Sequence, residues 1–170
     1  VYAIAQAHAM LAAGLARRAL VIGGDVLSKI LDWTDRTTCV LFGDGAGAVV
    51  LERVESGGFL GVELGADGGG GANLWLPGSG SRKFEVPDRV VKMNGREVFK
   101  FATRVMVSSA EAILAECELT VDDVDVYVPH QANVRIIDHA ARKLGIPEER
   151  TVVNVHRYGN TSSGSIPLAL

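Results

Sequence analysis

Two polar side chains, His130 and Asn160, follow expected strands and can donate hydrogen bonds. His130 lies in YVPHQANVRIID (127–138), directly after an apolar run, and Asn160 lies in RYGNTSSGSIPLAL (157–170). The ends of strands are where α/β folds assemble their sites. A histidine and an asparagine directed at one point supply two donors, which suits an oxyanion that forms during a reaction. Taken singly, each has a simpler interpretation, the histidine as a satisfied polar residue and the asparagine as a turn residue.

Other motifs in the sequence lack the context that their chemistry needs. GDGAG (43–47) precedes an expected strand, whereas a dinucleotide fingerprint opens a helix, so turn glycines are the favoured interpretation. The four histidines fall in separate expected elements, so no metal site is predicted. Cys39 stands among apolar residues as a small hydrophobe, and Cys117 lies near an expected helix C-terminus, where a thiol is a weaker nucleophile. We assign catalysis to neither cysteine.

The composition is that of a soluble α/β protein. The chain has 170 residues, 48% of them hydrophobic, and a formal net charge of −3, which argues against a nucleic-acid partner. No apolar run approaches the ~20 residues of a membrane helix. Two cysteines are too few for a disulfide framework and fit a reducing compartment, so we expect a cytoplasmic protein.

Alternating periodicities predict a layered α/β architecture. The run ALVIGGDVL (19–27) indicates a buried strand of the parallel type, and the strongest helical period runs from Asn94 to Cys117. A stretch rich in Gly, Pro and charge at 70–92 is expected as a long loop. The remaining expected helices are 2–18, 133–144 and 162–170, and the remaining expected strands are 46–54, 58–68, 123–129 and 151–155.

Both ends of the sequence fall inside expected elements. A helical period is already running at Ile4, with no Ser, Thr, Asp or Asn before it as a cap. The sequence stops within the apolar stretch SIPLAL, with no helix-ending signal. We therefore expect a fragment of a longer protein.

Four stretches together resemble β-ketoacyl-acyl-carrier-protein synthase III, a family with the thiolase-like layered α/β/α/β/α fold. In chain order they are LDWTDRTTCVLFGDGAGAVVL, MNGREVFKFA, VPHQANVRIID and RYGNTSSGSIPLAL, and the likeness runs along essentially the whole chain. It implies that residues 1–67 belong to an N-terminal half, that 68–93 connect the halves, and that 94–170 begin a C-terminal half. The expected fold is incomplete in this chain.

The resemblance implies a decarboxylating Claisen condensation that initiates fatty-acid synthesis. An acyl-CoA primer, expected to be acetyl-CoA, would acylate a cysteine, and malonyl-acyl-carrier-protein would then condense with that acyl group. The family's catalytic histidine and asparagine correspond to His130 and Asn160. Its nucleophilic cysteine would lie a few residues before Val1, where a helix N-terminus depresses a thiol pKa.

The same resemblance implies no permanently bound cofactor and no metal. CoA thioesters and the phosphopantetheine of the carrier protein would be substrates, and the protein would be a homodimer. Arg36 corresponds to a residue near the CoA adenine and phosphates. The expected pantetheine tunnel is lined by Gly95, Phe99 and Asn133, and the expected acyl pocket by Leu27 and Phe42, two residues that read equally well as core.

Basic residues repeat on two expected helices. Arg96, Lys100 and Arg104 are spaced to share one helix face, a pattern that usually marks ordinary solvated charge. The resemblance instead implies a docking surface for an acidic carrier protein. The expected docking residues are Lys100, Arg135, Arg142 and Lys143.

Three functions are compatible with these residues. The first is the synthase III condensation, and the second is a condensing enzyme of secondary metabolism with another starter acyl group. The third is a partner subunit that keeps the fold and the docking face without a nucleophile. Two positions depart from the family pattern, His156, where an acidic residue is commoner, and Gly164, where alanine is commoner.

Overall fold

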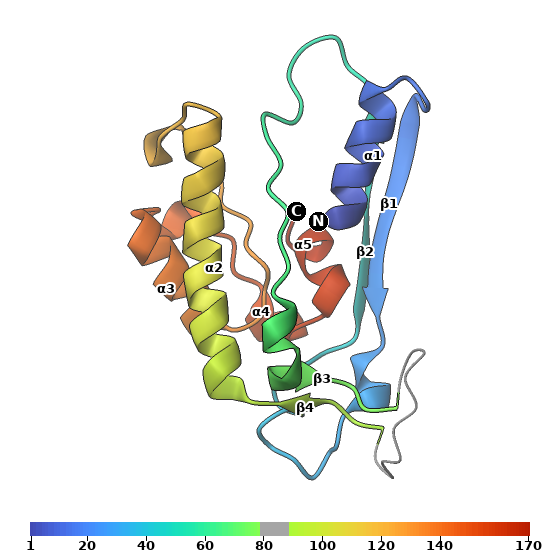
Figure 1. Cartoon of the computed structure of the whole chain (residues 1–170), viewed down its shortest axis with the longest axis vertical. Helices are drawn as coiled ribbons and strands as arrows, with labels where there is room; N and C mark the ends of the chain where they lie inside the picture. The colour runs from blue at the N-terminus through green and yellow to red at the C-terminus, as the bar shows by residue number, and fades with distance from the viewer. Residues whose placement is uncertain (79–88) are drawn as a thin grey trace.

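A computed structural model describes residues 1–78 and 89–170, so part of the loop expected at 70–92 lies outside the described residues. Figure 1 shows the long helix α2 (Gly95–Glu116) on one side and the strand pair β1 (Arg18–Asp25) and β2 (Gly45–Glu52) on the other. Helices and strands of the described residues form the layered α/β arrangement that the sequence predicts.

β1 and β2 are antiparallel, with Leu20 opposite Val50. One face packs against α1 (Tyr2–Ala12) and α5 (Ser165–Ala169), while the other leaves Leu20 63%, Ile22 66% and Val50 67% exposed. The prediction of a buried parallel-type strand at 19–27 is wrong. Both faces of β1 are apolar, which produces an unbroken apolar run, but the strand has an antiparallel partner and one exposed face.

Two glycines allow the C-terminal segment to lie directly on this strand pair. A Cβ at Gly47 would come within 2.9 Å of Pro167 Cβ, and a Cβ at Gly23 would clash with the carbonyl oxygen of Ser163. Because these two glycines carry no side chains, the C-terminal segment packs directly on the backbone of the strands. The segment around residues 163–167 is therefore held at a fixed distance from β1 and β2.

α1 ends at Ala12, whereas the predicted helix continued to residue 18. Gly14 adopts a φ of +73°, its amide donates to Leu11 O, and the Leu15 amide donates to Met10 O. These bonds form a Schellman motif, which stops a helix at a left-handed glycine. Leu15, which follows this glycine, is consequently 75% exposed.

α2 and α3 (Val134–Leu144) agree with the predicted helices and pack against each other. Asn133 caps α3, because its Oδ1 accepts a hydrogen bond of 2.9 Å from the Arg135 amide. Gly145, at a φ of +76°, ends the helix. The buried face of α3 consists of Ile136, Ile137, Ala140 and Ala141.

Three segments predicted as strands do not form regular strands in the structure. Residues 58–68 run extended between α2 and α1 without strand pairing, and Phe59 packs against the His8 ring at 4.7 Å. The predicted strands 123–129 and 151–155 meet in one parallel bridge between Tyr127 and Thr151. The apolar composition of these segments predicted strands, but strand pairing depends on partners that local sequence does not specify.

The remaining elements are short. The predicted helix 162–170 divides into the 3₁₀ turn η5 (Ser162–Gly164) and α5. The expected loop contains η2 (Gly68–Asn73) and the paired strands β3 (Leu74–Trp75) and β4 (Lys92–Met93). The others are η1 (Leu27–Ile30), η3 (Val121–Asp123), η4 (Glu148–Arg150) and α4 (Val155–Tyr158). In the two described ranges, every helix is too short or too polar to cross a membrane.

Candidate active site

Hydrogen bonds of the Gln131 side chain hold the segment that contains His130 in place. Its side chain is 1% exposed, and its Nε2 donates to Pro129 O at 3.0 Å and Val152 O at 2.9 Å. Its Oε1 accepts from the amides of Asn154 at 2.7 Å and Val155 at 3.2 Å. A buried amide with all these groups paired is a rigid support, since losing any partner leaves a buried polar group unsatisfied. The position of His130 is thereby fixed relative to residues 152–155.

Ser165, the first residue of α5, touches the imidazole of His130. Its Oγ lies 2.9 Å from His130 Nδ1 and accepts a hydrogen bond of 2.7 Å from the Gln131 amide. Ser165 is 1% exposed. Local sequence spacing does not predict this serine as a site residue, because 35 residues separate it from His130.

Asn160 is held by its backbone and by its own side chain. Its amide donates to Leu41 O at 2.8 Å, and its carbonyl accepts from the Gly43 amide at 2.9 Å. Its Oδ1 accepts from the Ser162 amide at 3.0 Å, and among the described residues no acceptor takes its Nδ2 hydrogens. The side-chain NH₂ therefore remains available as a donor.

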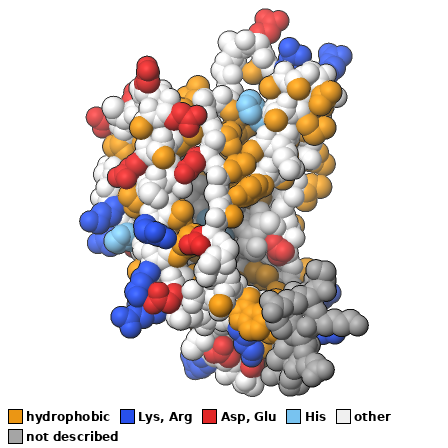
Figure 2. Space-filling model, viewed as in Figure 1, with side chains coloured by type: hydrophobic (Ala, Val, Ile, Leu, Met, Phe, Trp, Pro, Cys, Tyr) orange, Lys and Arg blue, Asp and Glu red, His pale blue; other side chains and the backbone are white. Residues whose placement is uncertain are grey.

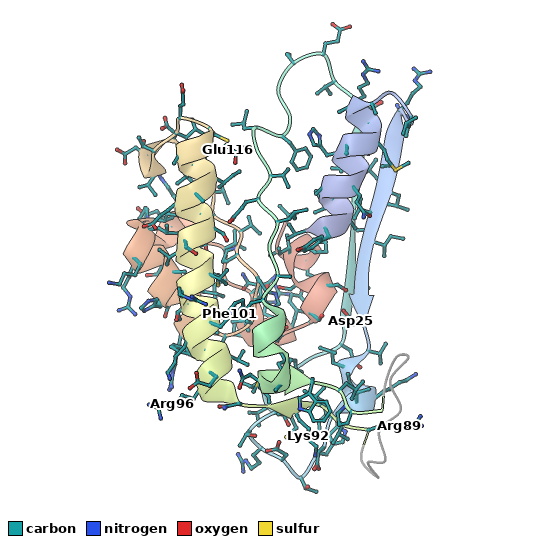
Figure 3. The ribbon with its side chains drawn as sticks, in the orientation of Figure 1. Asp25, Arg89, Lys92, Arg96, Phe101 and Glu116 are labelled. Atoms are coloured by element: carbon teal, nitrogen blue, oxygen red, sulfur yellow. The ribbon has the colours of Figure 1, made fainter. Side chains whose placement is uncertain are left out.

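Asp25 ties the turn after Asn160 to the end of β1 (Figure 3). Its Oδ2 accepts from the Ser163 hydroxyl at 2.6 Å and the Ser163 amide at 3.0 Å. The Ser163 hydroxyl bond is the main reason why the pKa of Asp25 lies below its usual value. Ser162, at a φ of +51°, adopts a conformation that is uncommon for a residue with a side chain.

His130 and Asn160 line one cavity of 290 Å³. His130 also borders a second cavity of 360 Å³, which Val1 and Ile4 of the α1 N-terminus line as well. Burial lowers the pKa of His130, so the ring is neutral at physiological pH. The other residues around the 290 Å³ cavity are Leu27, Phe42, Leu74, Trp75, Leu76, Val91 and Ser162.

Leu27 and Phe42, expected in an acyl pocket, thus lie on the cavity of His130 and Asn160, whereas the residues expected to bind CoA lie elsewhere. Arg36 is exposed in a turn that Asp35 organises by accepting from the Thr37 amide and hydroxyl. Gly95 and Phe99 lie in the first turns of α2. Asn133 borders a separate cavity with Val40 and His156.

The basic residues expected at a docking surface are exposed on α2 and α3. Figure 2 shows Lys and Arg side chains gathered at the lower left of the visible face, over these two helices. Lys100 pairs with Glu97 at 2.7 Å, an exposed ion pair of the kind that contributes little to stability. Arg142 Nε donates to Asp138 O at 3.1 Å. Arg135 and Lys143 complete the expected set.

Neither Cys39 nor Cys117 lines the cavities that His130 borders. Cys117 follows the last residue of α2, as predicted, and both thiols are half-buried. Across residues 1–78 and 89–170, no three His, Cys, Asp or Glu side chains are grouped as metal ligands. Gly164 is buried, and a Cβ there would lie 2.7 Å from Gly45 O, so an alanine would require the backbone of the turn or of β2 to shift.

Residues 1–68 match the model of 3-oxoacyl-[acyl-carrier-protein] synthase III, and residues 114–170 match the C-terminal model of the same enzymes. The β-ketoacyl-[acyl-carrier-protein] synthase III of Desulfitobacterium hafniense Y51 is 52% identical over 99% of this chain and 53% of its own length. That of Symbiobacterium thermophilum is 52% identical over 100% of this chain and 54% of its own length.

Solved structures give the same result. The synthase III of Thermus thermophilus superposes with a TM-score of 0.91 at 52% identity, covering 99% of this chain and 53% of that one. The priming β-ketosynthase of the R1128 polyketide pathway also gives a TM-score of 0.91, at 37% identity over 99% of this chain and 52% of its own. The fold is thus α/β and thiolase-like, and the chain spans about half the length of the curated relatives it matches. The chain belongs to the β-ketoacyl-[acyl-carrier-protein] synthase III family.

Proposed function

We propose that this chain supplies the histidine and asparagine of a condensing enzyme that joins an acyl-CoA primer, acetyl-CoA, to malonyl-acyl-carrier-protein. The observation that carries the proposal is the shared cavity of His130 and Asn160, with the apolar Leu27 and Phe42 in its wall. The product would be a β-ketoacyl-acyl-carrier-protein, the first condensation product of fatty-acid synthesis.

The first half-reaction needs a nucleophile, which we place in residues before Val1. Val1 borders the same cavity as His130, so a cysteine preceding it would lie near the imidazole and at the N-terminus of α1. A helix N-terminus favours the thiolate. The thiolate attacks the acyl-CoA carbonyl, the thioester bond to CoA breaks, and CoA leaves as its thiol after taking up a proton.

The second half-reaction uses His130 and Asn160. The malonyl carbon–carbon bond to the carboxylate breaks, carbon dioxide leaves, and the electron pair moves into the thioester carbonyl to form an enolate. His130 and Asn160 donate hydrogen bonds to the enolate oxygen, and each such donor typically lowers a barrier by about 3 kcal/mol. The enolate carbon then attacks the acyl-enzyme carbonyl and expels the cysteine thiolate.

Substrate binding extends the proposal to residues outside the cavity. Arg36 would contact the nucleotide end of CoA, and Gly95, Phe99 and Asn133 would lie along the path of pantetheine. The exposed cations Lys100, Arg135, Arg142 and Lys143 would receive the acidic carrier protein, since complementary charge speeds such encounters. We further propose that the protein is a homodimer, that it acts in the cytoplasm, and that it holds no permanently bound cofactor.

The two alternatives differ from this proposal in measurable ways. A ketosynthase of secondary metabolism would accept a starter other than acetyl-CoA. The likeness to the R1128 priming ketosynthase is at 37% identity, below the 52% to the synthase III relatives. A partner subunit without a nucleophile would take up no acyl group.

The test uses the full-length protein that contains these residues. Incubation with acetyl-CoA should add one acetyl group to the intact mass, and malonyl-acyl-carrier-protein should then be decarboxylated. His130→Ala and Asn160→Ala should each slow decarboxylation by about 100–1000-fold while acetyl uptake persists. Wild-type decarboxylation in His130→Ala, or absence of any acyl adduct on the wild-type protein, would contradict the proposal.

A further inference from the structure

The contact between Ser165 and His130 determines which ring nitrogen carries the hydrogen. Ser165 Oγ accepts from the Gln131 amide at 2.7 Å, and a backbone N–H can only donate. The hydroxyl hydrogen of Ser165 must therefore point elsewhere. Within the described part of the chain, His130 Nδ1, at 2.9 Å, is the only acceptor that this hydroxyl reaches.

The opposite tautomer would leave a buried hydrogen unpaired. With hydrogen on Nδ1, the ring and the Gln131 amide would both donate to Ser165 Oγ, and the serine's own hydrogen would have no acceptor. Ser165 is 1% exposed, so water cannot replace that acceptor. Buried donors without partners are strongly disfavoured. The network therefore selects Nδ1 as the acceptor and Nε2 as the N–H.

We propose that Ser165 is a positioning residue that holds His130 as its Nε2–H tautomer, with that hydrogen directed away from α5 and towards the cavity shared with Asn160. Nδ1 faces Ser165, so Nε2 is the nitrogen left to meet a ligand. The effect of this tautomer on catalysis rests on the proposed function, whereas the assignment of the tautomer is independent of that function.

The residues around Ser165 hold it in a fixed position, as a positioning residue requires. Gly164 packs against Gly45, and the backbone of Ser163 lies on Gly23, so the start of α5 cannot move without displacing β1 or β2. The Gln131 amide donates to Ser165 Oγ, and the Gln131 side chain is itself held by a hydrogen bond to Pro129 O. One serine thus connects the histidine segment, the strand pair and the turn of Asn160.

The tautomer is measured directly by long-range ¹H–¹⁵N correlation NMR of the full-length protein labelled with ¹⁵N-histidine, at a pH where the ring is neutral. We expect Nδ1 of His130 to show the shift of an acceptor nitrogen and Nε2 that of a protonated one. A wild-type ring with its hydrogen on Nδ1 overturns the proposal, whatever the protein catalyses.

Three variants then separate positioning from folding. Ser165→Ala removes the donor to Nδ1, so we expect a mixed tautomer and a decarboxylation kcat lower by about 10–100-fold, with KM within about 2-fold. Ser165→Thr keeps the hydroxyl and should restore the Nε2–H tautomer and most of the rate. Ser108→Ala removes an exposed hydroxyl that bonds Val105 O on α2, and should leave tautomer and rate unchanged.

The outcomes distinguish this inference from the proposed function. If Ser165→Ala keeps both the Nε2–H tautomer and the wild-type rate, Ser165 has no positioning role. If Ser165→Ala changes the tautomer but the wild-type protein neither takes up acetyl nor decarboxylates malonyl-acyl-carrier-protein, the assignment to Ser165 is supported and the proposed function fails. If Ser165→Ala does not fold, the wild-type spectrum and Ser165→Thr still decide.

Discussion

At the scale of single residues, groups outside the cavity orient the two side chains that would bind the ligand. Asn160 presents its NH₂ because its Oδ1 is occupied by the Ser162 amide, and His130 presents one ring nitrogen because Ser165 occupies the other. Histidine and asparagine are both ambiguous donors until one end is engaged. The chemistry of the cavity thus depends on hydrogen bonds made outside it.

The pKa of His130 gives a prediction on pH. Burial disfavours the imidazolium, so the folded pKa lies below the ordinary value of ~6.5 that applies in the unfolded chain. We expect the decarboxylation rate of the full-length protein to stay level as pH falls through ~6.5 and to decline only through the lower, folded pKa. A pH–rate profile with its acidic midpoint at or above ~6.5 would contradict this.

The same shift predicts the sign of the stability change. Between the folded and unfolded pKa values the unfolded chain binds more protons, so the free energy of unfolding rises with pH through this window and levels off above it. His130→Ala should lack this component of the slope in denaturant titrations, which serves as the control for the profile.

At the scale of elements, the sequence predicted best where stability is local. α2 and α3 show a helical period over several turns, and Asn133 and Gly145 mark the ends of α3. The predicted helix runs beyond the end of α1, because the apolar spacing continues past Gly14, whereas this glycine in its left-handed conformation stops the helix. The strands were predicted with less success, since register and partner depend on distant segments.

The glycine contacts of β1 give a prediction at this scale. In Gly23→Ala the new methyl group would clash with the Ser163 carbonyl, so we expect the free energy of unfolding to fall by about 1–3 kcal/mol. Gly65→Ala is the matched control, because a Cβ there meets nothing within 4 Å, and it should change stability by less than about 0.5 kcal/mol. Equal denaturation midpoints for the two variants would show that the close approach contributes nothing.

At the scale of the whole molecule, the candidate site gathers residues from both ends of the chain. Val1, Leu27, Phe42, His130 and Asn160 border its two cavities. The residue types of His130 and Asn160 predicted two donors for an oxyanion, and the family resemblance added Leu27 and Phe42 as acyl-pocket residues. The sequence does not predict the hydrogen bonds of Ser165 and of the Gln131 side chain, because a buried hydrogen-bond network has no sequence period and forms only when the chain is folded.

The uncovered face of the β1–β2 pair predicts the behaviour of the 170-residue chain in isolation. Leu20, Ile22 and Val50 are exposed together on this face, and contiguous exposed apolar side chains promote association, so we expect self-association and dye binding in solution. Leu20→Thr combined with Val50→Thr should shift the sedimentation profile towards monomer, whereas Val126→Thr, exposed elsewhere, should not. A monomeric wild-type chain would contradict the prediction.

The backbone contact between residues 163–167 and the two strands also bears on how the site could change over evolution. Where backbone meets backbone, no side-chain substitution can enlarge the space without moving the turn that holds Asn160 and Ser165. The apolar wall of the 290 Å³ cavity, by contrast, is built from side chains whose size can change by substitution: Leu27, Phe42, Leu74, Trp75, Leu76 and Val91. We expect new starter preferences to arise by substitution there, while the donor side of the cavity stays constant among descendants.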